Sequence, residues 1–213
     1  MPARVKICGV STPAALDAAI RASADYVGLN FYPPSPRYVS AQVAAGLAAR
    51  AAKHIPMVGV FVDADDDFLA DAITAGQLDA IQLHGHEPPE RAAQVRSRFG
   101  LPVWKVLSVA GPEDIASAAS YRATADFLLF DAKTPAGSAL PGGMGLTFDW
   151  GLLAAYKGPL PWGLAGGVTP ANVADAIAMT GAPMVDVSSG VESAPGIKDV
   201  DKIVAFCKAA QHI

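Results

Sequence analysis

The first stretch with chemical potential is Val5-Lys6-Ile7-Cys8-Gly9-Val10, close to the start of the chain. Its apolar residues predict a short buried strand, and alternation along a strand places Lys6 and Cys8 on the same face. A neighbouring cation favours the thiolate form of a cysteine, and a thiolate is a usable base or nucleophile. Free cysteines are also common in protein cores as small hydrophobes, so this stretch alone leaves a purely structural role open.

A second reactive candidate, Asp131, directly follows the four apolar residues Phe127 to Phe130. Burial raises the pKa of a carboxyl group, so a protonated Asp131 is a candidate general acid. The alternative is a structural role in which Asp131 forms an ion pair with Lys6 or Lys133.

Two loops near the end of the chain have the composition of a phosphate-binding site. Residues 164–172 form a glycine turn that leads into a helix start, and residues 187–192 contain hydroxyl groups and a glycine. Backbone N–H groups and a helix N-terminus favour a dianion. The expected phosphate ligands are Gly166, Gly167, Ser188, Ser189 and Gly190. The alternative for Gly166 and Gly167 is a simple role in a turn.

Other polar residues are candidates for substrate binding. Arg37 belongs to the proline-rich loop 33–37, where its guanidinium could bind a carboxylate bidentately, although an exposed loop arginine is often only solvated. Asp186 shares a strand face with Ser188, and we expect it either to orient a sugar hydroxyl or to balance the charge of Lys6.

Gln82 and His84 alternate along one predicted strand, where they could bind substrate or be satisfied polar groups of the core. A single histidine with no His or Cys partner at ligand spacing does not indicate a metal site.

The elements that position these residues alternate between strand and helix. The predicted strands are 5–10, 26–31, 57–62, 80–85, 103–109, 127–132, 162–168 and 184–188. The predicted helices cover about 13–24, 40–54, 65–76, 88–99, 112–122, 148–156, from 169 onward, and 199–211. Short apolar strands buried on both faces are typical of a parallel sheet covered by helices.

Eight such units predict an α/β fold, a closed (β/α)8 TIM barrel that forms a single domain over residues 1–213. An open doubly wound sheet is the alternative, but it needs a G-x-G-x-x-G turn after the first strand, which the chain lacks. In a closed barrel the C-terminal ends of the strands carry the active site. Polar residues are concentrated at those predicted ends, which favours an enzyme.

Composition excludes several classes of protein. Of 213 residues, 52% are hydrophobic and 17% charged, so a disordered chain is excluded. A net charge of −4 with no basic block argues against nucleic acid as a partner. No apolar run reaches the length of a membrane span, and no signal peptide is visible, so we expect a cytoplasmic protein. Its two cysteines indicate neither a disulfide framework nor a metal cluster.

Taken as an ordered set, these residues resemble the phosphoribosylanthranilate isomerase family of tryptophan biosynthesis. The matching segments are Lys6-Ile7-Cys8-Gly9, Phe31…Ser35-Pro36-Arg37, Gln82-Leu83-His84-Gly85, Phe130-Asp131, Gly142-Gly143-x-Gly145…Phe148-Asp149-Trp150, Leu164-Ala165-Gly166-Gly167, Asn172-Val173 and Asp186-Val187-Ser188-Ser189-Gly190-Val191-Glu192…Pro195-Gly196-Lys198-Asp199. Each segment is weakly specific, but together they span nearly the whole chain.

The resemblance implies an Amadori rearrangement of N-(5'-phosphoribosyl)anthranilate that uses no metal and no cofactor. It implies Cys8 as general base and Asp131 as general acid. It also implies that Arg37 binds the anthranilate carboxylate and that the last two loops bind the phosphate.

One loop departs from the family pattern. It reads Gly143-Met144-Gly145-Leu146, where the family more often has a small hydroxyl residue and a basic residue. A side-chain role in phosphate binding is therefore in doubt, whereas the amides of Gly143 and Gly145 can still bind substrate. The loop, 133–146, could act as a lid.

Three other functions are less compatible with these residues. The related isomerase of histidine biosynthesis uses an aspartate where this chain has Cys8. A ribulose-phosphate epimerase needs metal-binding residues at the end of the second strand, where the chain has Leu29-Asn30-Phe31. A catalytically silent phosphate-binding barrel would not need both Cys8 and Asp131. Whether the protein is a monomer or a homodimer does not follow from the sequence.

Overall fold

Eight parallel strands close into a barrel in sequence order, with the last strand hydrogen-bonded to the first. The computed structural model describes residues 2–134, 142–143 and 145–211. The strands are β1 (Arg4–Cys8), β2 (Tyr26–Asn30), β3 (Met57–Phe61), β4 (Ala80–Leu83), β5 (Val103–Val109), β6 (Phe127–Ala132), β7 (Trp162–Leu164) and β8 (Met184–Val187). The predicted (β/α)8 barrel is thus confirmed.

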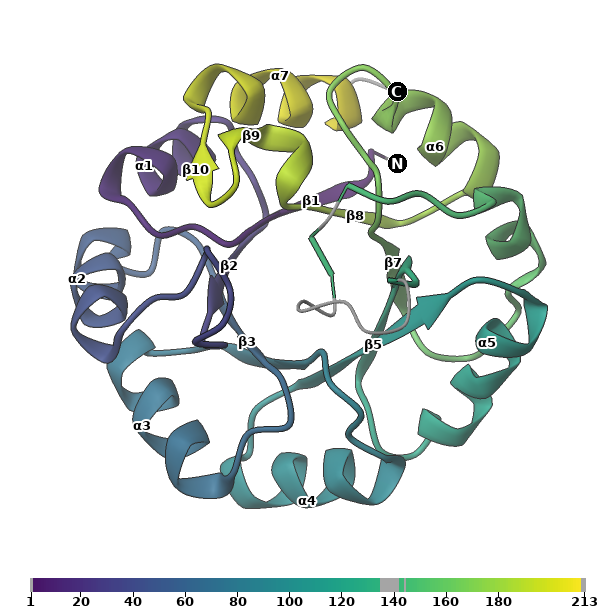
Figure 1. The fold of residues 1–213 in the computed structure, drawn as a ribbon, viewed down its shortest axis with the longest axis horizontal. Coiled ribbons are helices and arrows are strands. Elements are labelled where there is room, and N and C mark those ends of the chain that lie inside the picture. The colour runs from purple at the N-terminus through teal and green to yellow at the C-terminus, as the bar shows by residue number, and fades with distance from the viewer. Residues whose placement is uncertain (1, 135–141, 144, 212–213) are drawn as a thin grey trace.

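Helices surround the barrel as an outer layer (Figure 1). They are α1 (Pro13–Arg21), α2 (Ala41–Ala51), α3 (Asp66–Gly76), α4 (Pro89–Phe99), α5 (Pro112–Ala116), α6 (Val173–Thr180) and α7 (Val200–Gln211). Side-chain caps begin the first three: Thr12, Ser40 and Asp65 each accept a hydrogen bond from a backbone N–H of the first turn. A small antiparallel hairpin, β9 (Glu192–Ala194) and β10 (Ile197–Lys198), precedes α7.

The helix predicted over 148–156 is wrong in type. Trp150–Ala155 forms a 3₁₀ helix, η2. The Asp149 carboxylate accepts a hydrogen bond from the N–H of Gly151 at 2.9 Å, which starts a tight turn, and a glycine in the first turn weakens an α-helix.

The helix predicted over 112–122 is divided in two. After α5, Ser117–Tyr121 continues as a second 3₁₀ helix, η1. The hydroxyls of Ser117 and Ser120 donate to carbonyls three residues earlier, which competes with α-helical hydrogen bonding.

The boundaries around β7 also differ from the prediction. The strand ends at Leu164 rather than Val168, because Gly166 and Gly167 adopt positive φ angles of +83° and +68°. The following helix begins at Val173, not at the Thr169-Pro170 pair.

Asn172 explains the late helix start. Its Oδ1 accepts a hydrogen bond from the N–H of Thr169 at 2.7 Å, and its Nδ2 donates to the carbonyl of Gly167 at 3.0 Å. These bonds hold residues 167–172 as a folded loop at the carboxyl end of β7.

The barrel interior is divided into an apolar lower part and a polar upper part. The lower part is an apolar plug formed by Val58, Ala80, Trp104, Val106, Phe127, Leu129 and Met184. The face that carries Leu129 and Met184 continues two residues later with Asp131 and Asp186, at the carboxyl ends of their strands. The interior therefore changes from hydrophobic to ionisable within one strand layer.

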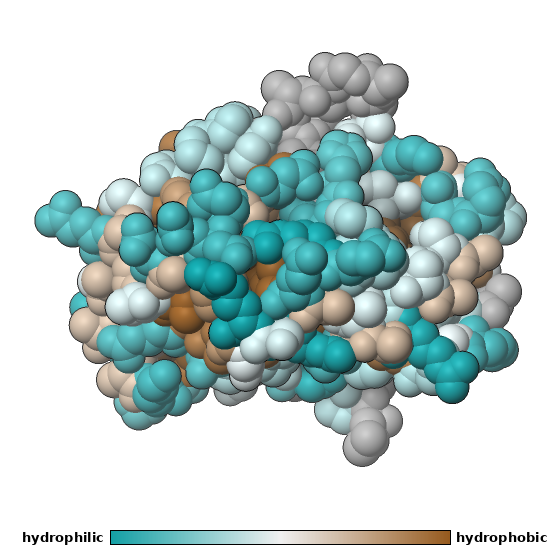
Figure 2. Space-filling model, turned by 90° about the horizontal axis from the view of Figure 1, so that it is seen from below, coloured by the Kyte–Doolittle hydropathy of each residue, from teal (hydrophilic) through white to brown (hydrophobic). Residues whose placement is uncertain are grey.

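A second, larger apolar core fills the space between the strands and the helices. On the face shown in Figure 2, hydrophilic side chains cover much of the surface, with apolar patches between them. Within the part of the chain that the structure describes, no helix combines the length and apolar character needed to cross a membrane.

Phe130 anchors β6 to this outer core. It is fully buried, and its ring centroid lies 5.1 Å from that of Tyr156 and 5.8 Å from that of Trp162. The neighbouring Asp131 points to the opposite face, so the packing of Phe130 fixes the strand that carries this carboxylate.

We expect Phe130→Ala to lower the free energy of unfolding by about 3–5 kcal/mol, the usual cost of an aromatic core cavity. Urea unfolding followed by circular dichroism measures this. Phe99→Ala, at a partly buried aromatic residue at the end of α4, is the control and should cost clearly less. Equal losses in the two variants would contradict the anchoring role of Phe130.

Candidate active site

A pocket opens at the carboxyl ends of the barrel strands, and it collects every site residue that the sequence predicted. These lining residues are Cys8, Arg37, Gln82, His84, Asp131, Gly143, Gly145, Gly166, Gly167, Asp186, Ser188, Ser189 and Gly190. They come from six of the eight strands or the loops that follow them, so the closed barrel is what brings them together.

Lys6 and Cys8 point into the barrel from β1, as strand alternation predicts. A methyl group at Gly28 of β2 would lie 2.9 Å from Sγ of Cys8 and 3.1 Å from Nζ of Lys6. Lys6 is fully buried, and its Nζ donates to Oδ1 of Asp186 at 3.0 Å. Of the two roles considered for Asp186, the geometry therefore supports that of counter-ion to Lys6, with its carboxylate still at the pocket wall.

Burial raises the pKa of the Cys8 thiol, and the Lys6 ammonium offsets only part of this effect. The expectation that the cation favours the thiolate is correct in direction, but in the free protein burial outweighs the effect of Lys6 on the pKa of Cys8. Cys8 rests as a thiol beside a cation that stabilises the thiolate once it forms. Cys207, the other cysteine, packs into the outer core from α7, and burial raises the pKa of its thiol to about 12.

Asp131 lies at the pocket wall without a lysine partner. Lys6 pairs with Asp186, and Lys133 pairs with Asp114 at 3.3 Å, so the proposed ion pairs of Asp131 are not formed. Its Oδ1 accepts a hydrogen bond from the N–H of Ala132 at 2.8 Å. Its Oδ2 is therefore the oxygen available for chemistry.

Gln82 and His84 are not satisfied core polar groups. Within the described part of the chain, Oε1 of Gln82 and Nε2 of His84 are buried and have no hydrogen-bond partner. Nε2 of His84 lies 3.5 Å from Oδ2 of Asp131, which is too long for a good hydrogen bond. Buried polar atoms without partners are rare in native proteins, so these two atoms are candidates for contact with a ligand.

The two loops predicted to bind phosphate lie against each other. Gly190 contacts the carbonyl oxygen of Val168 so closely that a Cβ at this position would overlap it. Gly166 likewise leaves no room for a side chain, because a Cβ there would lie 2.6 Å from the backbone nitrogen of Ala132. Glycine at these positions permits the close approach of the loops after β7 and β8, and both loops line the pocket.

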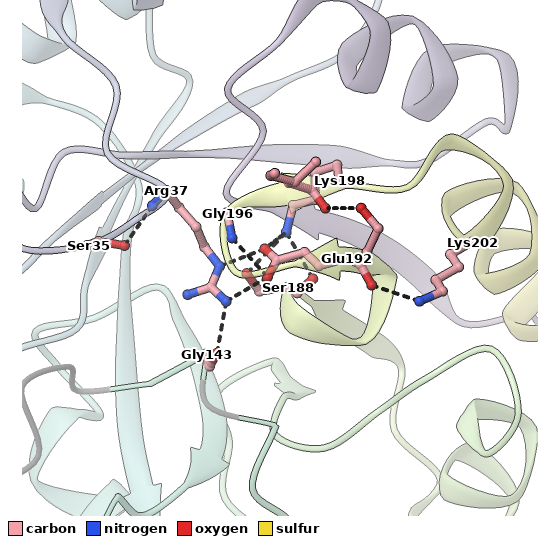
Figure 3. A network of polar contacts seen from close by, with 10 residues as sticks. Ser35, Arg37, Gly143, Ser188, Glu192, Gly196, Lys198 and Lys202 are labelled. Atoms are coloured by element: carbon pink, nitrogen blue, oxygen red, sulfur yellow. Dashed lines mark hydrogen bonds and ion pairs between the residues drawn. The ribbon is translucent and has the colours of Figure 1, made fainter.

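Arg37 is buried rather than solvated, with only 5% of its surface exposed. Its Nε and Nη2 donate to the two carboxylate oxygens of Glu192 at 2.8 and 2.9 Å, as Figure 3 shows. The sequence reasoning missed Glu192 and Lys198 as parts of the site. Their signal was present, because both lie in the last matching segment, but no chemistry was assigned to them.

The glycine loop before η2 contacts the same residues. A Cβ at Gly142 would lie 2.7 Å from Oδ2 of Asp131, and a Cβ at Gly143 would lie 2.6 Å from Nη1 of Arg37. Met144 and residues 135–141 lie outside the described residues, so the predictions for that side chain and for a lid over 133–146 are not tested.

No metal centre is evident among residues 2–134, 142–143 and 145–211, where no three His, Cys, Asp or Glu side chains converge at ligand distance. The pocket offers a thiol, two carboxyl groups, an arginine and three glycine-containing loops. This set suits acid–base chemistry on an anionic substrate.

Known proteins resemble this chain over its full length. The family model described as N-(5'phosphoribosyl)anthranilate (PRA) isomerase matches residues 5–209. N-(5'-phosphoribosyl)anthranilate isomerase from Paramagnetospirillum magneticum is 57% identical over 99% of this chain and 98% of the relative. The same enzyme from Zymomonas mobilis is 50% identical over 99% of both chains.

Solved structures agree. Phosphoribosyl anthranilate isomerase from Thermotoga maritima superposes with a TM-score of 0.87 at 38% identity, covering 98% of both chains. A phosphoribosyl anthranilate isomerase in complex with reduced 1-(o-carboxyphenylamino)-1-deoxyribulose 5-phosphate has a TM-score of 0.85 at 35% identity, again over 98% of both chains. Together with the pocket, these matches show that the chain is an isomerase and belongs to the N-(5'-phosphoribosyl)anthranilate isomerase family.

Proposed function

We propose that this isomerase converts N-(5'-phosphoribosyl)anthranilate into 1-(2-carboxyphenylamino)-1-deoxyribulose 5-phosphate by an Amadori rearrangement without a metal or cofactor. Family membership supports the substrate and the place in tryptophan biosynthesis. The observation that carries the residue roles is that Cys8 and Asp131 line one pocket from β1 and β6, which are separated by β7 and β8 around the barrel. Two proton-transfer groups on different sides of one pocket can serve two faces of a bound sugar.

Asp131 is the general acid of the first step. Its Oδ2 proton passes to the furanose ring oxygen, and the bond between that oxygen and C1 breaks with its electron pair going to oxygen. The nitrogen lone pair then forms a double bond to C1, which gives a protonated Schiff base. No redox change occurs, so a carboxyl group suffices for this step.

Cys8 is the general base of the second step. The cationic nitrogen acidifies the hydrogen on C2, and the thiolate removes it to give an enolamine. Proton movement from the C2 hydroxyl and to C1 then produces the ketone. Lys6, which is held by Asp186, stabilises the thiolate that attacks this hydrogen.

The remaining lining residues bind the substrate. The loops after β7 and β8 receive the phosphate through Gly166, Gly167, Ser188, Ser189 and Gly190. Arg37 receives the anthranilate carboxylate, and the unpartnered atoms of Gln82 and His84 receive sugar hydroxyls. The amides of Gly143 and Gly145 close the pocket beside Arg37.

The fluorescence of phosphoribosylanthranilate tests the proposal directly. We expect the signal to fall when pure protein is added, at a rate proportional to enzyme concentration and unaffected by EDTA. An unchanged signal would favour a silent phosphate-binding barrel, and EDTA-sensitive turnover restored by a divalent ion would contradict the metal-free scheme.

We expect Cys8→Ser and Asp131→Asn each to lower kcat by about 10²–10⁴-fold, because each removes one proton-transfer group. Stopped-flow fluorescence gives kcat, and circular dichroism verifies folding. Cys207→Ala, at the buried cysteine of α7 outside the pocket, is the matched control and should keep wild-type kcat. A folded Cys8 or Asp131 variant with near-normal kcat would remove that residue from the mechanism.

The raised pKa of Cys8 gives a pH dependence with a definite sign. Because the thiol is protonated at neutral pH, we expect kcat/KM to increase as pH rises toward the pKa of Cys8. Lys6→Met combined with Asp186→Asn leaves no lone buried charge. It removes both the cation that lowers this pKa and the carboxylate that raises it, and the effect of the cation is the larger of the two. The increase should then move to higher pH, and the rate at a fixed lower pH should fall about tenfold for each pH unit that the profile moves. An identical pH profile in this double variant would argue against the role of Lys6.

Arg37→Ala should chiefly raise KM, since it removes a group that holds the substrate in the ground state and the transition state alike. Initial-rate fluorescence over a range of substrate concentrations separates KM from kcat. An unchanged KM would place the anthranilate carboxylate elsewhere in the pocket.

A further inference from the structure

We infer that Glu192 is a positioning residue that organises both ends of the substrate site at once, by orienting Arg37 directly and Ser188 through Lys198. The inference rests on the proposed function, in which Arg37 and Ser188 contact opposite ends of the substrate. Glu192 does not line the main pocket, so it acts through these neighbours rather than by touching substrate.

The Glu192 carboxylate is saturated with hydrogen bonds. Oε1 accepts from Nε of Arg37 and from Nζ of Lys198, both at 2.8 Å, and Oε2 accepts from Nη2 of Arg37 at 2.9 Å and from the N–H of Gly196 at 3.2 Å. Although burial opposes it, hydrogen bonding by Arg37 and Lys198 holds the pKa of Glu192 below its usual range, so the carboxylate is charged. A saturated, charged acceptor fixes the orientation of its donors.

At the Arg37 end, this orientation leaves one edge of the guanidinium for substrate. Nε and Nη2 are used by Glu192, and Nη2 also donates to the carbonyl of Gly143 at 2.9 Å. Nη1 has no acceptor among the described residues, and Arg37 is part of the pocket wall. The contacts of Glu192 thus leave Nη1, which lies beside the pocket-lining Gly143, as the free donor of Arg37.

At the other end of the site, Lys198 links Glu192 to Ser188 and so orients Ser188. Its side chain is only 1% exposed, and its Nζ donates to the carbonyl of Ser188 at 2.9 Å and to the Ser188 hydroxyl at 3.3 Å. Burial lowers the pKa of Lys198, and Glu192 opposes this effect. The 2.8 Å ion pair with Glu192 therefore favours the charged form of Lys198, while Lys198 holds the first hydroxyl of the phosphate loop.

Two further contacts fix the backbone around Glu192. Lys202 of α7 donates to the Glu192 carbonyl at 2.7 Å, as Figure 3 shows. Gly196, with φ of +81°, turns the β9–β10 hairpin against the carbonyl of Pro36, where a Cβ would overlap. The carboxylate is thereby fixed relative to the loop of Arg37 before substrate arrives.

The charges of this cluster are matched to the substrate. Two buried cations, Arg37 and Lys198, share one buried anion, so the cluster carries a net positive charge. An anionic substrate completes the balance. Removal of Glu192 alone would leave two uncompensated cations and raise the risk of misfolding.

The test compares two variants, Glu192→Gln and Glu192→Gln/Lys198→Met, and the second keeps the net charge of the cluster unchanged. Circular dichroism and Tm establish which variants fold. Initial rates then give kcat and KM for phosphoribosylanthranilate, and inorganic phosphate as a competitive inhibitor gives Ki for the phosphate end. In a folded variant we expect KM to rise about tenfold and Ki about threefold, while kcat stays within about threefold of wild type.

Arg96→Met/Asp126→Asn is the matched control. This ion pair of 3.4 Å lies next to the start of β5, at the opposite end of the barrel, and is more exposed than the Glu192 cluster. It should lower Tm without changing KM or Ki. A general loss of stability would affect both pairs alike, whereas loss of positioning changes KM and Ki only at Glu192.

Wild-type KM and Ki in a folded Glu192 variant would overturn the inference, and a change in KM alone would refute the link to the phosphate end. Failure of the proposed function is a different result, namely no turnover by the wild-type protein. Calorimetric titration with inorganic phosphate then still tests the link to Ser188, because the same variants should weaken phosphate binding about threefold. Unchanged phosphate affinity in a folded variant would again overturn it.

Discussion

The buried ion pair between Lys6 and Asp186 is the constraint on which the architecture of the pocket depends. The two residues are direct neighbours in the β1–β8 pairing that closes the barrel. A lysine with no exposed surface needs a partner, because a lone charge in the interior is very costly. The ion pair therefore joins the two strands that close the barrel, at the level where the interior changes from apolar to ionisable side chains. It also puts an ammonium group beside the thiol of Cys8.

Above this layer, the charged groups are arranged in pairs that leave specific atoms unmatched. Lys6 is paired with Asp186, and Arg37 and Lys198 share Glu192. The atoms left over are one edge of Arg37 and the orphaned atoms of Gln82 and His84. Among the described residues the charge pairing is incomplete, because Asp131 has no lysine partner and two cations share Glu192. The pocket therefore presents an incomplete hydrogen-bonding surface, which a ligand with a carboxylate and hydroxyls can complete.

Local rules were enough to predict much of this arrangement. Alternation along β1 places Lys6 and Cys8 together, and the repeated strand–helix pattern leads to the closed barrel and to a rim that gathers the polar residues. The rule that a proline after a cap residue begins a helix failed at Thr169-Pro170, because the side chain of Asn172 bonds within the loop.

The degree of burial of the site residues and the ion pairs between distant parts of the chain could not be predicted. The burial of Arg37 depends on Glu192, which lies 155 residues later and meets it only in the folded barrel. The pKa of Cys8 also depends on how completely the barrel excludes water, and a neighbouring lysine in the sequence does not reveal this. Local sequence patterns do not predict interactions between distant parts of the chain.

The apolar plug beneath the pocket has a consequence for how such a protein diversifies. Trp104 and Phe127, with ring centroids 4.8 Å apart, belong to the buried apolar plug that fills the barrel below the pocket. The described residues that line the pocket lie at the carboxyl ends of the strands and in the segments that follow them, above this plug. New selectivity can arise by exchanging those upper segments without rebuilding what carries them, so the scaffold and its chemistry are free to evolve at separate rates.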